Sequence, residues 1–176
     1  MDSTDSEGSS DKKLKGSVSR VYADVLNKKE SCFWDYENFT PIWGDPSHYD
    51  VIKKVGKGKY SEVFEGINRL NGRKCIIKVL KPVKSKKIKR EIQILMNLCN
   101  CPNIIKLYDV VKHGQSNTPA LVMELVNATD HKQLYPSLSL AEIKYYMYEL
   151  LVALDYSHAN GVFHRDIKPQ KFVIEL

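Results

Sequence analysis

The sequence lacks the long apolar runs that a membrane span requires. No apolar run in its 176 residues approaches the ~20 residues that cross a bilayer. The first eleven residues are polar, contain four acidic residues and no base, and have no apolar segment of the kind found in a secretory signal. These absences predict an intracellular protein, nuclear or cytoplasmic, that does not enter a membrane.

Cysteine is also scarce and unfavourably spaced for metal binding. The four cysteines include no C-x-x-C pair and have no cluster of partner histidines, so neither a zinc site nor a redox motif is expected, and no metal ligands are predicted. The composition, 43% hydrophobic and 27% charged, is typical of a globular domain. The net charge of +6 favours acidic or phosphate-bearing partners, and no specific nucleic acid is expected.

The pattern of apolar residues predicts an α+β fold. Residues 1–16 are rich in Ser, Asp and Lys and are predicted to be a disordered tail. Alternating apolar residues then predict three antiparallel strands, with a hairpin signal at Asn71-Gly72, and two later strands. The five strand segments are Val51–Val55, Val63–Ile67, Cys75–Leu80, Ile104–Val111 and Ala120–Val126.

Two helices are predicted from apolar spacing. Residues Ser85–Leu98 carry one apolar stripe at helical intervals. A second helix of roughly 20 residues follows Ser139, which forms a capping box with Glu142, and it ends at Gly161. A short strand is expected at Phe172–Ile174, and no internal repeat is present.

A glycine-containing turn between the first two strands predicts a phosphate-binding loop. Residues 56–63 match G-x-G-x-x-G-x-V through Gly56, Gly58 and Val63, except that Ser61 replaces the last glycine. Glycines allow backbone N–H groups to approach phosphate oxygens closely. Alone, this pattern is weak, and an ordinary hairpin is the simpler interpretation.

The next strand and helix strengthen this interpretation. Lys78 occupies the lysine position of a V-A-I-K-type strand, where it would bind α- and β-phosphates and pair with a helix glutamate, for which Glu91 is the candidate. In isolation, each residue would be interpreted as a solvent-exposed surface charge. In order, and ahead of a third motif, they predict a nucleotide site.

That third motif is His164-Arg165-Asp166-Ile167-Lys168-Pro169. In the kinase pattern H-R-D-x-x-x-x-N, the Asp accepts the substrate hydroxyl proton and the Asn holds a metal ion. Asp166 and Lys168 are therefore the candidate catalytic residues. Lys171 stands at the Asn position, and a protonated ammonium has no lone pair with which to ligate a metal.

Together these motifs carry a resemblance. From about Val21 the chain resembles the casein kinase 2 catalytic alpha-subunit family of protein serine/threonine kinases. Further runs support it: Arg20-Val21-Tyr22, Phe33-Trp34-Asp35-Tyr36-Glu37, Gly58–Glu65, Leu80–Lys84 and Lys86–Ile92. The resemblance implies use of ATP, or GTP, with Mg²⁺, a preference for acidic substrates, and assembly with a regulatory beta subunit. It also accounts for Ser61, which belongs to that family.

The resemblance implies roles for further residues. Met123 would be the gatekeeper, Glu124 and Val126 would contact the base at the hinge, and Val55, Val63 and Ile76 would surround the ring. A basic cluster, here defined as Lys81, Lys84, Lys86, Lys87, Lys89 and Arg90, would recognise acidic residues beside the target serine. On composition alone, this cluster is equally compatible with a solvated helix face, a nuclear-import signal or a nucleic-acid patch.

The resemblance also predicts the domain organisation. It places an N-terminal extension at residues 17–48, a complete small lobe at 49–127, with five strands and one helix, and the start of a helical large lobe at 128–176. The sequence given ends at Leu176, ahead of the segment that supplies the D-F-G aspartate, and Gln170 stands where the family has His. We therefore expect negligible kinase activity from this chain alone.

Three functions remain open on the sequence. The chain is a serine/threonine kinase domain by ancestry, a non-catalytic binding module for a beta subunit or acidic proteins, or a fragment whose apolar surfaces lack packing partners.

Overall fold

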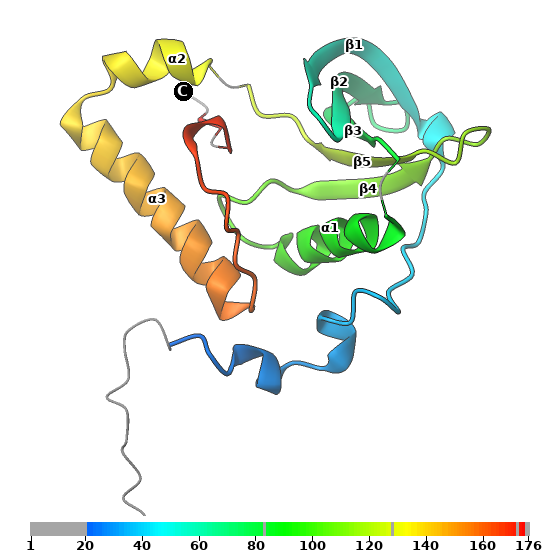
Figure 1. Cartoon of the computed structure of the whole chain (residues 1–176). Helices are drawn as coiled ribbons and strands as arrows, with labels where there is room; N and C mark the ends of the chain where they lie inside the picture. Colours follow the sequence, from blue (N-terminus) through cyan, green and yellow to red (C-terminus); the bar gives the residue numbers. More distant parts are fainter. Residues whose placement is uncertain (1–20, 83, 128, 172, 175–176) are drawn as a thin grey trace, which may run out of the picture.

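The fold is built on a five-stranded antiparallel sheet (Figure 1). The computed structural model describes residues 21–82, 84–127, 129–171 and 173–174, so the predicted tail at 1–16 lies outside the described residues. The strands lie in the order β1-β2-β3-β5-β4. Their bounds are Tyr49–Lys57 for β1, Ser61–Asn68 for β2, Lys74–Leu80 for β3, Leu107–Lys112 for β4 and Pro119–Glu124 for β5.

In the view of Figure 1, α1 lies below the sheet, and α2 and α3 lie to its left. They are α1 (Ser85–Leu98), α2 (His131–Leu134) and α3 (Leu140–Ala159). Short 3-10 helices occupy Val25–Lys28, Ser31–Phe33, Pro46–His48, Tyr135–Ser137 and Pro169–Lys171. Sequence reasoning missed α2 and the 3-10 helices, because segments of three or four residues leave no periodicity to detect.

Alternation along the strands divides the sheet into two packed faces. One face holds a core of Cys75, Ile77, Val111, Ala120 and Val122. On the opposite face, Leu80, Val110 and Leu121 of the sheet form a core with Ile92 of α1. Since Ile76 and Lys78 alternate with Cys75 and Ile77, they project to the face that α1 covers. The strand register therefore places both candidate nucleotide residues on the α1 side.

The helix α1 has the bounds predicted from its apolar stripe. Ile92 is fully buried and Leu98 nearly so, while Ile88 and Leu95 pack against the same core. Two predicted strands were too long: β4 begins at Leu107 rather than Ile104, and β5 ends at Glu124 rather than Val126. Val173 and Ile174 form no strand, and Phe172 lies outside the described residues.

Local hydrogen bonds fix both ends of α3. Ser139 and Glu142 form the predicted capping box at its start. At its end, the amide of Gly161 donates to the carbonyl of His158 and the amide of Val162 donates to that of Ser157, which is a Schellman motif. Gly161 has φ +73°, a conformation that glycine adopts without a Cβ penalty. The chain therefore leaves α3 in a defined direction, into the candidate catalytic loop.

Residues 21–48, the described part of the N-terminal extension, run from the end of α3 past α1 to β1 (Figure 1). Near α3, the Tyr22 hydroxyl donates to Asp155 and the Lys29 ammonium donates to Asn160 at 3.1 Å. Near α1, the amide side chain of Asn97 donates to the carbonyl of Phe33 at 2.8 Å. The extension therefore connects α1 to the C-terminal end of α3.

No helix among residues 21–82, 84–127 and 129–171 combines the length and apolar character of a membrane span.

Candidate active site

Lys78 and Glu91 form an ion pair between the sheet and α1. The Lys78 ammonium donates to a Glu91 carboxylate oxygen at 2.6 Å, and both side chains are partly buried. Lys78 lies near the middle of β3, opposite Val63 on β2, and Glu91 lies midway along α1. This contact depends on the predicted helix register, and it holds a single ammonium in a fixed position on the face that α1 covers.

A hydrogen bond from Lys81 fixes the loop between β1 and β2. The amide of Gly58 donates to the carbonyl of Ser61 at 2.8 Å, and the Lys81 ammonium donates to the carbonyl of Gly58 at 3.0 Å. A Cβ at Gly56 or Gly58 would meet its nearest atoms only at 3.5 and 3.6 Å. The fold itself therefore does not require glycine at these two positions, whereas close approach of a ligand to the backbone would.

Apolar residues surround the ion pair on the same face. Ile76 lies directly opposite Met123 on β5, and Val63 lies opposite Lys78. All three apolar side chains are partly exposed, and Val55 on β1 is 49% exposed. An apolar surface beside a fixed ammonium suits a flat ring attached to an anionic group.

The predicted hinge residues are in different environments. The amide of Glu124 donates to the carbonyl of Lys106 at 3.0 Å, and its carboxylate accepts from the amide of Lys106 at 2.8 Å. The Glu124 amide is therefore not free for a ligand. Val126 is partly buried in the irregular segment between β5 and α2.

The candidate catalytic loop turns back from the end of α3 toward α2 (Figure 1). The tyrosine hydroxyl of Tyr135 donates to the carbonyl of Pro169 at 3.4 Å, which places the loop's second half beside α2. The amide of Asp166 donates to Nδ1 of His164 at 3.2 Å. Arg165 has φ +61°, an unusual value for a residue with a Cβ, so the loop contains a strained position next to Asp166.

Two ammonium groups face the exposed carboxylate of Asp166. Lys168 lies 3.1 Å from Oδ1, and Lys171 lies 3.7 Å from Oδ2. The hydrogen bond from Lys168 holds the pKa of Asp166 below its ordinary value of 3.8, against the opposing effect of desolvation, and the charges of Lys168 and Lys171 lower it further. No described hydrogen bond or ion pair joins this group to Lys78 or Glu91, so the structure presents two separate charged groups.

With this geometry in place, a family assignment follows from comparison. The model of the protein kinase domain family matches residues 49–175. The chain belongs to the protein kinase family. The match begins where β1 begins, and the five-stranded sheet with its helices is consistent with a kinase small lobe and part of a large lobe. The family implies ATP binding and phosphotransfer chemistry with Mg²⁺.

The described residues do not fit the metal that the kinase family implies. No three His, Cys, Asp or Glu side chains of the described ranges come together in a group able to hold a metal ion. Asp166 has an ammonium beside each oxygen, and Lys171 stands where the kinase pattern has a metal-binding Asn.

The basic cluster contains residues that make contacts within the described part of the protein and residues that do not. Lys81 holds the glycine loop, Lys86 pairs with Glu37, and Lys89 donates to the carbonyl of Glu37 at 2.9 Å. The Arg90 guanidinium lies 5.1 Å from the ring centre of Tyr36. Lys84 and Lys87 are exposed and make no ion pair with any residue that the structure describes.

Sequence reasoning missed one surface feature near the loop. Tyr36, Arg90, Ile94, residues 161–163 and Arg165 line a hollow of about 250 Å³ between the extension, α1 and the loop. Arg165 of the H-R-D motif is the sequence feature that could have indicated this hollow, but nothing in the sequence places Arg165 near Arg90.

Proposed function

We propose that this protein is an ATP-binding serine/threonine kinase domain of the casein kinase 2 alpha type, directed to acidic substrates. The observation that carries the proposal is the 2.6 Å ion pair of Lys78 and Glu91 beside an apolar surface. The finer assignment rests on the sequence runs that resemble that family, including Gly58–Glu65 and Lys86–Ile92. GTP is an alternative nucleotide under the same resemblance.

The proposal assigns a role to each part of the site. The loop at Gly56 and Gly58, with Ser61, would lie over the phosphates, and Lys78 would bind two of them while Glu91 orients it. Met123, Ile76, Val63 and Val55 would enclose the base. Asp166 would accept the substrate hydroxyl proton, with Lys168 beside it as a donor to the transferred phosphoryl group.

Thermal unfolding with ATP tests the nucleotide site. A ligand at 100 times its Kd stabilises the folded state by about 2.7 kcal/mol, which corresponds to a Tm rise of roughly 5–10 °C for a chain of this size. We expect this rise for the wild type and its loss in Lys78→Met. Lys74→Met, which removes a lysine of the same strand that is paired with Glu65, should keep the rise. An equal rise in all three proteins would contradict the proposal.

We further propose that the chain alone transfers phosphate at a negligible rate. The support is Lys171, whose ammonium lies beside Asp166 at a position where kinases hold a metal ion. Loss of several kcal/mol of charge stabilisation corresponds to a rate loss of about a thousandfold or more. Incorporation of labelled phosphate into an acidic serine peptide is the measurement. Clear incorporation that disappears in Asp166→Asn would show that the chain is an active enzyme.

A binding role without catalysis is the second candidate, and the exposed Lys84 and Lys87 favour it. We propose an acidic protein segment as the partner, since two uncommitted ammonium groups at the start of α1 attract carboxylates. Lys84→Glu combined with Lys87→Glu should weaken binding of an acidic peptide in a salt-dependent manner. A regulatory beta subunit is a further proposed partner by resemblance, and co-purification of the two tests it.

A further inference from the structure

The catalytic loop contains one ammonium group, that of Lys171, which the kinase pattern does not predict. Lys168 and Lys171 place two ammonium groups around Asp166, one beside each carboxylate oxygen. Two positive charges face a single negative charge, so this end of the loop has a surplus of positive charge. Among described residues, no further carboxylate pairs with either lysine.

This arrangement disagrees with a divalent cation at the same place. A metal ion there needs carboxylate or amide oxygens with free lone pairs. The ammonium of Lys171 offers N–H donors and no lone pair, and its charge repels a dication. The same properties suit a different ligand, because N–H donors and positive charge are what phosphate oxygens bind.

Backbone and side-chain contacts both position Lys171. Its amide donates to the carbonyl of Lys168 at 2.8 Å within the 3-10 helix Pro169–Lys171. Its ammonium lies 3.7 Å from Asp166, which is longer than a hydrogen bond, and the side chain is 47% exposed. Asp166 therefore orients the ammonium by charge without engaging its N–H groups, and these remain available to a ligand from solvent.

We propose that Lys171 is a built-in counter-cation for the phosphate tail of a nucleoside triphosphate, so that this chain binds ATP without a divalent metal. The proposal rests on the proposed nucleotide site at Lys78 and extends it to the catalytic loop. It predicts an order of ligand preference: the lysine acts on the terminal phosphates, so it strengthens ATP binding and leaves AMP binding unchanged. Added Mg²⁺, which competes for the same phosphate oxygens, does not improve the affinity.

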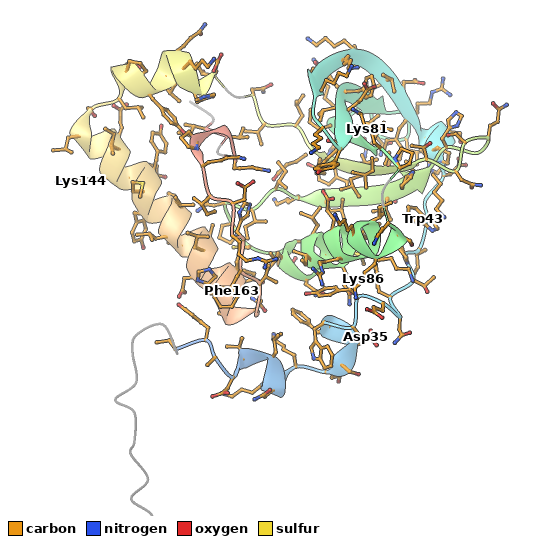
Figure 2. All side chains as sticks on the ribbon, viewed as in Figure 1. Asp35, Trp43, Lys81, Lys86, Lys144 and Phe163 are labelled. Atoms are coloured by element: carbon orange, nitrogen blue, oxygen red, sulfur yellow. The ribbon has the colours of Figure 1, made fainter. Side chains whose placement is uncertain are left out.

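Isothermal titration of the full chain with ATP tests this proposal, once in EDTA and once in MgCl₂. We expect the wild type to bind ATP in EDTA at least as tightly as in MgCl₂. Lys171→Gln should lose about tenfold in EDTA affinity, the loss of one charge-assisted contact. Lys171→Arg, which keeps the charge, should retain most of the affinity. Lys144→Gln removes an exposed lysine on the outer side of α3 (Figure 2) and serves as the matched control.

The outcomes separate this proposal from the function on which it rests. If the wild type binds ATP only with Mg²⁺, or if Lys171→Gln binds in EDTA as the wild type does, Lys171 has no such role while the nucleotide site stands. If the wild type binds ATP in neither buffer, or binds it unchanged after Lys78→Met, the nucleotide site itself is wrong and this inference falls with it. A tenfold loss that also appears with AMP would assign Lys171 a structural effect and would overturn the proposal.

Discussion

At the scale of single residues, charge pairing decides what each candidate side chain can do. Lys78 is fixed by Glu91, and Asp166 is held ionised by two lysines. The pattern of motifs predicted the first pair, because the β3 lysine and the helix glutamate occupy known positions along the chain. It predicted Lys171 as a poor metal ligand, but not its contact with Asp166, since that contact depends on the local turn of a 3-10 helix.

The titration of Asp166 tests this electrostatic account. The hydrogen bond from Lys168 lowers its pKa below 3.8, followed by the charges of Lys168 and Lys171. A depressed pKa contributes to stability above the unfolded value, and the contribution is lost as pH falls through the folded-state pKa, so the effect lies in the acid range. We expect Lys168→Met to raise the pKa of Asp166 toward 3.8, and Lys171→Gln to raise it less.

Carboxyl ¹³C shifts measured against pH give this pKa directly. Glu142, whose own pKa is lowered by hydrogen bonds from Ser139, provides an internal control that neither variant should move. An unchanged Asp166 titration in Lys168→Met would show that the ion pair at 3.1 Å does not form in solution.

At the scale of elements, local signals were predicted well and element ends less well. The bounds of α1 and the capping box of α3 follow from side chains within one or two turns, so the sequence contains their full cause. The ends of β4 and β5 do not, because a strand ends where its neighbour stops pairing. Apolar residues such as Ile104 and Val126 continue the pattern after the ladder has ended.

The end of α3 supports a prediction at this scale. Alanine at Gly161 costs about 1–2 kcal/mol for the left-handed backbone, and its Cβ would also lie 2.4 Å from Leu26, so the total loss of unfolding free energy should exceed that. Gly72 has φ +70° and open space around it. The free energy of unfolding of Gly72→Ala should therefore fall by the backbone cost alone.

Urea unfolding of these variants, with one control and one double variant, separates the two contributions. Gly114→Ala, with open space and no positive φ, should change the free energy of unfolding by less than about 0.5 kcal/mol. Combining Gly161→Ala with Leu26→Ala should recover the part that comes from the clash. Equal losses for Gly161→Ala and Gly72→Ala would show that Leu26 does not pack against the turn.

At the scale of the whole molecule, the extension at residues 21–48 connects parts that the strand and helix pattern leaves separate. Its side-chain hydrogen bonds with α1 and with the C-terminal end of α3 join residues 49 to 133 positions apart, from polar side chains to backbone carbonyls or to other polar groups. Hydrophobic periodicity contains no information on such contacts, which is why the sequence indicated the existence of the extension and not its path. Half of the basic cluster, namely Lys81, Lys86 and Lys89, also contacts this segment or the glycine loop, and recognition of a substrate by these lysines stays a prediction.

Asn97→Ala tests whether the extension is bound to α1 in solution. The change removes the donor to the carbonyl of Phe33, and a partly buried acceptor left without its partner costs about 1–3 kcal/mol. We expect a lower urea midpoint and faster hydrogen exchange in residues 21–48, with exchange in β2 and β3 unchanged, because the sheet packs independently of this bond.

The control is Asn100→Ala, which changes an exposed residue just past the same helix and should leave both measurements near wild type. Faster exchange throughout the sheet would mean that the extension and the small-lobe core unfold as one unit, and unchanged exchange in residues 21–48 would mean that this bond does not hold the extension in place.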